Sequence, residues 1–480
     1  MDRSRSRSTM HRLSRTIFVA AVAAAATACD RDSPSDDNPG ARPIVAAFNA
    51  VPDMRAITFL REEEVWTALE FGTATEFRDV GADQYDLNFD TALPGDKTTA
   101  CAGHDGDDVK DSDECTRLAS QSINVIADHE YVVALLGAWG NLRVQVYDKA
   151  VYEFDTSTDD GDPDEETAEV QFFHWSDDLP EIDVYLARPG ANLSPVDSRA
   201  TLTSGGEFHA VVDDGDYVIT LAPVGEPANP LFTSETFALE EHTRVAFAIL
   251  PGAGEGTSSI KVVRFRDQAG TLLDRRVSTE LRFAHLAPDT GSFDVYAEDD
   301  YAQPFVAALA EATISPYVTV PGSAVADLDL DITPAGNPGV LLGREQVDLS
   351  RGERATFVLF GSAGRLDGLR VPDPFRRVAT HARLRAINAA AASLDFFVVR
   401  TGSNINTLAP TMQLAATTAG GLNYFDPERY DIVLTRAGTD DIVFGPHTVD
   451  LAAGGIYTVV ATGTGDLTSA DALLLDDFAN

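Results

Sequence analysis

The sequence predicts an all-β protein made of tandem antiparallel β-sandwich domains, and three observations carry this prediction. Segments alternate with period two, as in Leu328–Ile332, where apolar residues alternate with carboxylates. Such alternation is typical of a strand with one buried face, because successive side chains point to opposite faces. Gly, Pro and Asp separate the short strands at the spacing of a β-sandwich. No segment has the pattern of a long amphipathic helix.

One unit recurs four times along the chain, at intervals of roughly a hundred residues. Each copy opens with an apolar strand, a polar residue, a short turn and a second strand. The polar residues at equivalent positions are Asn49, His174, His285 and Asn388. The residues that follow them on the second strand are Thr58, Asp183, Asp294 and Asp395.

The recurring histidines have two interpretations. They are ligands presented at the same place on two units, or each ends a strand and bonds the backbone of a neighbouring turn. The second interpretation is favoured, because an asparagine of similar reach replaces the histidine in the first and fourth copies.

The length of 480 residues also predicts several domains, because single hydrophobic cores stop growing near 250–300 residues. The acidic linker between the first two repeats has no apolar content, so we expect a hinge there, followed by a stiffer row of three repeats. The predicted domains are a signal peptide at 1–28, a lipidated Cys and disordered tether at 29–43, repeat 1 at 44–154 with an insert at 98–117, the linker at 155–167, repeat 2 at 168–268, repeat 3 at 279–374 and repeat 4 at 380–480.

The charge balance excludes one large class of partners. Lys and Arg number 36 against 76 Asp and Glu, which gives a formal net charge of −40. Phosphate backbones repel such a polyanion, so we expect no nucleic-acid binding.

The N-terminus has the pattern of an export signal. Five arginines precede the apolar run Thr16–Ala28, which is too short to span a bilayer. Ala26-Thr27-Ala28 followed by Cys29 resembles a bacterial lipobox, although Ala26 stands where Leu is usual. The alternative is an ordinary cleavage site with Cys29 as the first mature residue. The lipid interpretation predicts an exported lipoprotein, anchored in a membrane and facing the periplasm or the cell surface.

The cysteine count supports lipidation, because only Cys29, Cys101 and Cys115 occur. An odd count is awkward in an oxidising compartment, and a lipidated Cys29 leaves Cys101 and Cys115 as a disulfide pair. The carboxylates between them would be the ligands of a Ca²⁺ site, although EF-hand spacing fails at Val109 and Lys110. The favoured alternative is a solvated acidic loop without a cofactor. The candidate ligands are Asp105, Asp107, Asp108, Asp111, Asp113 and Glu114.

The third copy also resembles a known family. Its residues are His285, Ala287-Pro288-Asp289, Asp294-Val295-Tyr296 and Val320-Pro321-Gly322. This pattern is similar to a bacterial envelope repeat, the domain-of-unknown-function family 4397. The resemblance implies an immunoglobulin-like β-sandwich and a place in the cell envelope. It implies no activity, because the family has no assigned chemistry.

The search for catalytic motifs predicts no active site. His129-Glu130 begins like a metalloprotease motif, but Val133 stands where the second His is required. The leading hypothesis is therefore a non-enzymatic envelope lipoprotein that acts as a spacer or as a binding or adhesion module. Its partners would be the membrane, through the lipid, and an unknown envelope protein or glycan. The alternatives are a Ca²⁺-responsive adhesion or matrix protein and a polysaccharide-degrading envelope enzyme.

Overall fold

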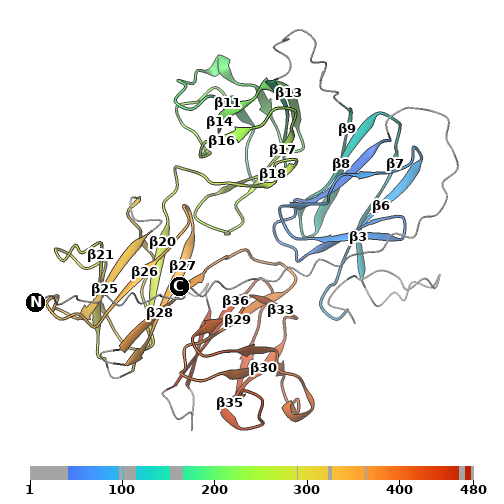
Figure 1. The fold of residues 1–480 in the computed structure, drawn as a ribbon. Helices are drawn as coiled ribbons and strands as arrows, with labels where there is room; N and C mark the ends of the chain where they lie inside the picture. Colours follow the sequence, from blue (N-terminus) through green and yellow to red (C-terminus); the bar gives the residue numbers. More distant parts are fainter. Residues whose placement is uncertain are drawn as a thin grey trace, which may run out of the picture. The chain divides into compact units, whose positions relative to one another are not determined.

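The fold is built from β-strands, as the alternating pattern predicts. The computed structural model describes residues 42–96, 101, 115–151, 166–288, 290–322, 327–362, 365–463 and 471–476. Within these ranges the helices are short 3₁₀ turns, among them η2 (Pro195–Asp197) and η4 (Ile405–Thr407), and none has the length and apolarity needed to cross a bilayer. The all-β prediction is confirmed (Figure 1).

Repeat 1 comprises β1–β9, which form two sheets around one apolar core. The first sheet has the order β4-β1-β8-β9, with β5 also paired to β1, and the second has the order β3-β2-β6-β7. Phe59 and Phe89 are fully buried between them. The strands are β1 (Ile44–Asn49), β2 (Ile57–Arg61), β3 (Glu64–Leu69), β4 (Thr73–Ala74), β5 (Arg78–Asp79), β6 (Gln84–Thr91), β7 (Thr116–Asn124), β8 (His129–Ala138) and β9 (Asn141–Ala150).

Repeat 2 comprises β10–β19 and has the same plan. Its sheets have the orders β13-β10-β17-β18-β19 and β12-β11-β14-β15, with β16 paired to β14. Phe172, Phe232 and Phe247 fill the core between them. The strands are β10 (Thr167–His174), β11 (Ile182–Ala187), β12 (Ala200–Leu202), β13 (Glu207–Asp213), β14 (Gly215–Pro223), β15 (Phe232–Thr233), β16 (Phe237–Leu239), β17 (Arg244–Pro251), β18 (Ile260–Arg266) and β19 (Gly270–Leu272).

Repeat 3 comprises β20–β28. Its sheets have the orders β23-β20-β27-β28, with β24 also on β20, and β22-β21-β25-β26. Phe283 and Phe293 lie at the centre of its core. The strands are β20 (Glu280–His285), β21 (Phe293–Ala297), β22 (Val306–Leu309), β23 (Thr313–Ile314), β24 (Val318–Thr319), β25 (Leu328–Pro334), β26 (Gly343–Val347), β27 (Arg354–Ser362) and β28 (Arg365–Pro372).

Repeat 4 comprises β29–β37. Its sheets have the orders β32-β29-β36-β37, with β33 also on β29, and β31-β30-β34-β35. Phe396 and Leu434 are buried in its core. The strands are β29 (Ala382–Asn388), β30 (Leu394–Arg400), β31 (Met412–Leu414), β32 (Thr418–Ala419), β33 (Asn423–Phe425), β34 (Arg429–Arg436), β35 (Ile442–Asp450), β36 (Ile456–Thr462) and β37 (Asp471–Asp476).

One pairing in every repeat differs from the predicted antiparallel arrangement. In each repeat the first strand pairs in parallel with a long strand near the end of the repeat. The pairs are β1 with β8, β10 with β17, β20 with β27 and β29 with β36. Parallel partners need a long connection, and here the rest of the repeat supplies it. The other strand pairs of the described sheets are antiparallel, so each first sheet is mixed.

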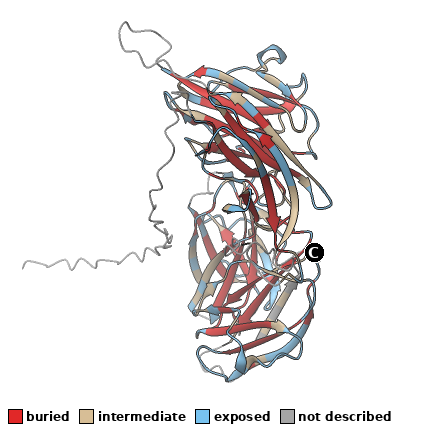
Figure 2. Ribbon diagram, turned by 90° about the vertical axis from the view of Figure 1, so that its right-hand side faces the viewer, coloured by how far each residue is buried: buried red, intermediate tan, exposed pale blue. Residues whose placement is uncertain are grey.

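The first strand of each repeat is buried on both faces, with at most one half-buried residue in each strand. Figure 2 shows buried stretches of strand in red. In repeat 1, Val45 and Ala47 point into the core of the sandwich. Phe48 points outward and packs on Trp175 of repeat 2, with ring centroids 4.6 Å apart. Repeats 1 and 2 therefore share a second apolar cluster, made of Phe48, Ala50, Phe71, Val132, Ala134, Leu136 and Tyr147 together with Phe173, Trp175, Ala246, Ala248, Leu250, Val263 and Phe265.

The expected hinge between repeats 1 and 2 is wrong for this reason. Residues 155–165 of the linker lie outside the described residues, but the sheets on either side of it share an apolar cluster. The composition of the linker carries no information about the outward faces of β1 and β10, where Phe48 and Phe173 pack in one apolar cluster. Repeats 3 and 4 share a smaller cluster of the same kind, made of Ala284, Leu286, Val358, Phe360 and Val371 with Ile387, Ala389 and Val460.

A buried arginine joins the two pairs of repeats. Arg376, 4% exposed, lies in the segment between repeats 3 and 4. Its Nη1 donates to the backbone oxygens of Pro52 at 3.2 Å and Met54 at 2.6 Å in repeat 1. The same guanidinium lies 3.3 Å from Glu255 of repeat 2. Residues Ala41–Asn480 form one compact unit, and the predicted domain boundaries inside it stay predictions.

We predict that Arg376→Met weakens this unit. The change keeps apolar volume but leaves the buried Met54 carbonyl without its donor, so we expect a loss of about 2–4 kcal/mol in the free energy of unfolding. Urea unfolding followed by tryptophan fluorescence measures it. The matched control is Arg377→Met at the neighbouring exposed position, and an equal loss in both variants would contradict the role of Arg376.

Candidate functional site

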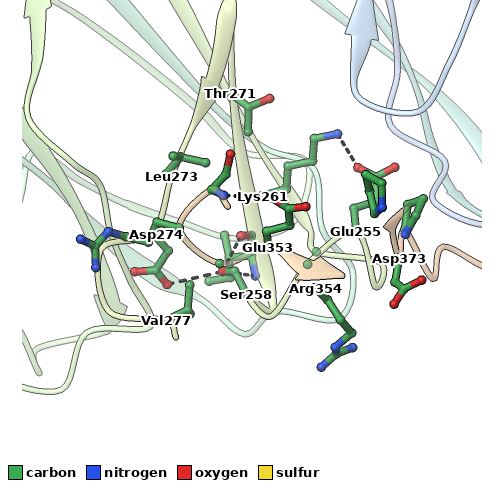
Figure 3. Close-up of a pocket in the computed structure, with 18 of the residues that line it drawn as sticks. Glu255, Ser258, Lys261, Thr271, Leu273, Asp274, Val277, Glu353, Arg354 and Asp373 are labelled. Carbon is green, nitrogen blue, oxygen red and sulfur yellow. Dashed lines mark hydrogen bonds and ion pairs between the residues drawn. The ribbon is translucent and has the colours of Figure 1, made fainter. Parts of the chain in front are cut away.

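The best-formed pocket lies where segments of repeats 2 and 3 meet, with a volume of about 410 Å³ (Figure 3). The turn after β17, strands β18 and β19, and residues 350–354 and 370–374 line it. Apolar groups of Ile260, Leu272 and Val277 form part of the wall. Charged side chains from both repeats complete it, so the pocket has the mixed lining of a binding site.

The charged groups of this pocket are paired with one another or with their neighbours. The Lys261 amino group lies 2.7 Å from Glu255, as Figure 3 shows. Asp274 accepts hydrogen bonds from the backbone N–H groups of Thr233 at 3.2 Å and Arg276 at 3.0 Å. Further ion pairs of the lining include Arg351–Glu235, Arg354–Glu280 and Arg370–Glu353. These interactions hold segments together, and the named side chains form no nucleophile–base pair.

The polar residue that ends the first strand has the same role in the four repeats. Asn49, His174, His285 and Asn388 are all fully buried. Each accepts a hydrogen bond from the backbone N–H two residues later. Each also bonds a backbone carbonyl of another turn or loop, as His285 Nε2 does with Gly291 O at 2.9 Å. The structural interpretation of these residues is confirmed.

The histidines therefore carry one proton each, on Nε2. Nδ1 must stay free of a proton to accept the backbone N–H, and Nε2 must donate to the carbonyl. Burial lowers the pKa of His174 and His285 below the ordinary 6.5. A protonated ring would lose the N–H bond and carry a charge away from water.

The recurring aspartate of the second strand holds a turn in three repeats. Asp183, Asp294 and Asp395 are nearly buried, and one carboxylate oxygen of each accepts the N–H of a glycine at 2.8 Å. Burial alone would raise the pKa of Asp183, but Gly225, Thr201 and Tyr185 donate to its carboxylate and hold the pKa below its usual value. These carboxylates are structural, and repeat 1 has Thr58 in their place.

Two buried ion clusters lie between repeats, and the sequence analysis missed both. Glu130, 1% exposed, lies 2.8 Å from both Lys149 and Arg266, and Lys149 also lies 2.6 Å from Glu169. Burial alone would raise the pKa of Glu130, but the hydrogen-bonded Arg266 and Lys149 hold it below its usual value. Glu130 belongs to the incomplete metalloprotease motif of the sequence analysis. A glutamate in an otherwise apolar strand was the sequence signal that could have indicated a buried ion pair.

The second ion cluster is centred on Asp373, whose side chain is completely buried between repeats 3 and 4. It pairs with Arg282 of β20 and Arg385 of β29, which occupy equivalent positions in their repeats. Tyr317 and Thr356 each donate a hydroxyl to the same carboxylate oxygen at 2.6 Å. The two arginines were visible in the sequence, but their shared partner lies in the segment between the repeats.

The structure tests the predicted disulfide but not the predicted lipidation and calcium sites. Cys101 and Cys115 form the predicted disulfide, with Cα atoms 5.8 Å apart. Cys29 and the six candidate Ca²⁺ ligands lie outside the described residues, so lipidation and calcium binding stay predictions. Within the described residues no group of three or more His, Cys, Asp or Glu side chains is arranged to hold a metal ion.

Comparison with family models gives one match. The family described as "Domain of unknown function (DUF4397)" matches residues 44–185 and 279–397, which is more than half of the chain. A search of curated proteins finds no match to this chain.

Comparison with solved structures finds matches of low sequence identity, among them the following two. The C-terminal domain of AlgF from P. aeruginosa is 16% identical, with 20% of this chain and 97% of that chain covered and a TM-score of 0.16. The Bacillus anthracis TIE protein is 9% identical, with 85% of this chain and 68% of that chain covered and a TM-score of 0.15.

We predict that acid destabilises the protein partly through His285. Because its pKa is lower in the folded chain, the unfolded chain takes up a proton first. The contribution of His285 is complete above about pH 6.5 and is lost as the pH falls below that value. His285→Asn, which copies repeats 1 and 4, should lessen the loss of stability between pH 7.5 and 5 in urea unfolding.

The matched control for His285→Asn is His209→Asn, at an exposed position on β13. It should leave the pH dependence as in the wild type. The same pH dependence in all three proteins would contradict the buried, neutral state of His285.

Proposed function

This chain belongs to the DUF4397 family, and we propose that it is a non-enzymatic envelope lipoprotein that binds or spaces other envelope components. In this proposal Cys29 carries the membrane anchor, and the paired repeats form the rigid body that the anchor holds. The partner is an envelope protein or a glycan.

The observation that carries the proposal is that the recurring polar residues bind backbone groups inside their own repeats. If these repeats formed an enzyme, their repeated His and Asp side chains would be expected to face a substrate. Here His174, His285 and Asp294 are buried and bond the backbone of their own repeat. Recurrence of these residues is therefore explained by folding, which supports a scaffold whose surface loops carry the binding function.

The pairing of the charged side chains in the pocket is consistent with a structural role and not with catalysis. A polysaccharide-degrading enzyme needs two carboxylates facing each other across a cleft, one of them able to give up a proton. At the described pocket Glu255 and Glu353 lie beside Lys261 and Arg370, and Asp274 accepts backbone N–H groups. Carboxylates that are paired in this way give the enzymatic alternative no support.

The net charge of −40 and the leader sequence support the location. The mature protein would stay soluble in a crowded compartment while its N-terminal lipid holds it at a membrane. One acyl chain anchors a protein only weakly, whereas two chains give stable attachment, as diacylated cysteine would.

We predict that Cys29→Ala releases the protein from the membrane. Wild-type protein should fractionate with membranes, and mass spectrometry of its N-terminus should show a diacylated Cys29. The variant should be exported and recovered in the soluble fraction, because the leader remains intact. An unmodified Cys29 thiol in the wild type would refute the lipoprotein part of the proposal.

The binding part of the proposal has its own test. Crosslinking in native envelopes, followed by purification of the full-length protein, should capture the same component from the wild type in repeated preparations. A wild-type protein that captures nothing above a control lipoprotein would refute it.

Calcium responsiveness is the second candidate, and the Cys101–Cys115 disulfide favours it. The bond closes a segment whose sequence contains Asp105, Asp108 and Asp111 among six carboxylates. Closing such a loop restricts the unfolded chain and brings like charges together, which a divalent cation would offset. Calorimetry with Ca²⁺ on the mature protein tests this candidate, and absence of both heat and a shift in the thermal midpoint would refute it.

A further inference from the structure

The segment between repeats 2 and 3 contains a turn that presents two adjacent arginines. Asp274 begins the turn, and its backbone oxygen accepts the N–H of Val277 at 3.4 Å. The Asp274 carboxylate accepts the N–H of Arg276 at 3.0 Å, which is a common role of aspartate at the first position of a turn. Arg275 and Arg276 therefore occupy the two central positions of the turn, and both are exposed.

The turn is held at both of its ends. On the side of repeat 2, Arg275 N donates to Thr233 O at 2.8 Å. On the side of repeat 3, the Thr279 hydroxyl donates to Ser350 O at 2.9 Å and accepts the N–H of Gly352 at 3.1 Å. Because these bonds fix the backbone, the turn loses little backbone entropy when its side chains bind a ligand.

A cavity of about 330 Å³ lies beside this turn, and its volume is in the range of small-molecule sites. The charged residues of its lining are Arg275, Arg276 and Arg351, and no Asp or Glu belongs to the lining. Acidic residues number 76 in this chain, against 36 Lys and Arg, so a lining with only positive charges is unusual in it. The cavity therefore differs from the larger pocket nearby, whose lining also contains Glu255 and Glu353.

Neighbouring carboxylates do not neutralise these arginines. In the part of the chain that the structure describes, Arg275 and Arg276 have no ion pair. Arg351 lies 2.9 Å from Glu235, but both side chains are more than one third exposed, so an anionic ligand could replace Glu235 at little cost. Other acids beside the lining have cations of their own, in the pairs Arg354–Glu280 and Arg370–Glu353.

The uncharged groups of the lining favour a sugar over a simple ion. Ser278 and Thr319 are exposed, and within the described ranges their hydroxyls have no hydrogen-bond partner. Exposed Pro321 and half-buried Val277 add apolar surface. A sugar has hydroxyls that can bond Ser278 and Thr319 and a C–H face that can pack on the apolar groups. An inorganic anion would leave these groups unused.

We propose that the Arg275–Arg276 turn and the cavity beside it bind a sugar that carries a carboxylate or a phosphate group. Guanidinium groups bind either anion through paired N–H donors. This inference rests on the proposed binding function, in which a glycan is one of two possible partners, and it gives that glycan a negative charge. The net charge of −40 does not prevent this binding, because salt screens charges more distant than about 8 Å at physiological ionic strength.

Ligand-observed NMR titration of the mature full-length protein tests the proposal, with glucuronate and glucose 6-phosphate as the probes. We expect at least one of them to bind, and the tighter one identifies the anionic group. Glucose has the same ring without the anion and should bind at least about tenfold more weakly. Binding of the anionic sugar should weaken as the salt concentration rises, because the guanidinium groups are exposed.

Two double variants locate the site. Arg275→Gln with Arg276→Gln removes both guanidinium groups of the turn but keeps its backbone bonds, and should weaken binding at least about tenfold. Arg42→Gln with Arg365→Gln removes the same charge at exposed positions that do not line the cavity, and should leave binding within about twofold of the wild type. Both should keep the thermal midpoint of the wild type, since all four side chains are exposed.

Hydrogen exchange of the wild type locates the site independently of the variants. Addition of the anionic sugar should give new protection at residues 275–279, where the turn lies beside the cavity. Protection confined to other parts of the chain would contradict the proposal.

The outcomes separate this site from the proposed function. Equal binding of glucose, equal losses in the two double variants, or no binding of either anionic sugar would overturn the site. Inorganic phosphate that binds as tightly as glucose 6-phosphate, or vesicles of anionic phospholipid that displace the sugar, would overturn the choice of a sugar as the ligand. Capture of a protein component from native envelopes would leave the broader binding function standing in each case.

Discussion

The architecture depends on a strand that is buried on both faces. In each repeat the first strand contributes one set of side chains to its own sandwich and the other set to the neighbouring repeat, as Ala47 and Phe48 do on β1. The outward side chains of this strand are buried against the neighbouring repeat, so a polar one among them, such as Arg282, needs a partner there. The requirement links the repeats in pairs, because an isolated sandwich would expose Phe48, Phe173 or Ile387 to water.

Charged residues at these interfaces follow from the same constraint. Glu130 and Asp373 lie where water is excluded, so each is surrounded by cations or hydroxyl donors. Such pairs add little net stability over apolar residues, but removal of one partner is costly. Their geometry requires one relative placement of two sheets, which an apolar face alone specifies poorly. The ion clusters thus set the register of surfaces that the hydrophobic effect brings together.

Much of the local structure was predictable from the sequence, whereas the assembly was not. Period-two alternation over Leu328–Ile332 predicts a strand, which the structure shows as β25 at Leu328–Pro334, and the recurring Asn and His mark the ends of the first strands. The parallel pairing of β1 with β8 joins residues about eighty positions apart, and alternation carries no information about such partners. The role of Arg376 could not be predicted, because its acceptors are backbone oxygens that no sequence pattern marks.

The extent of the family match is explained by this pairing. Each matched region covers one complete repeat and continues into the first two strands of the next, ending at residue 185 within β11 and at residue 397 within β30. The added strands include β10 and β29, whose outward faces complete the shared apolar clusters. A sandwich with one apolar outer face folds best when the covering strand follows directly in the same chain, because the cost of bringing them together is then small.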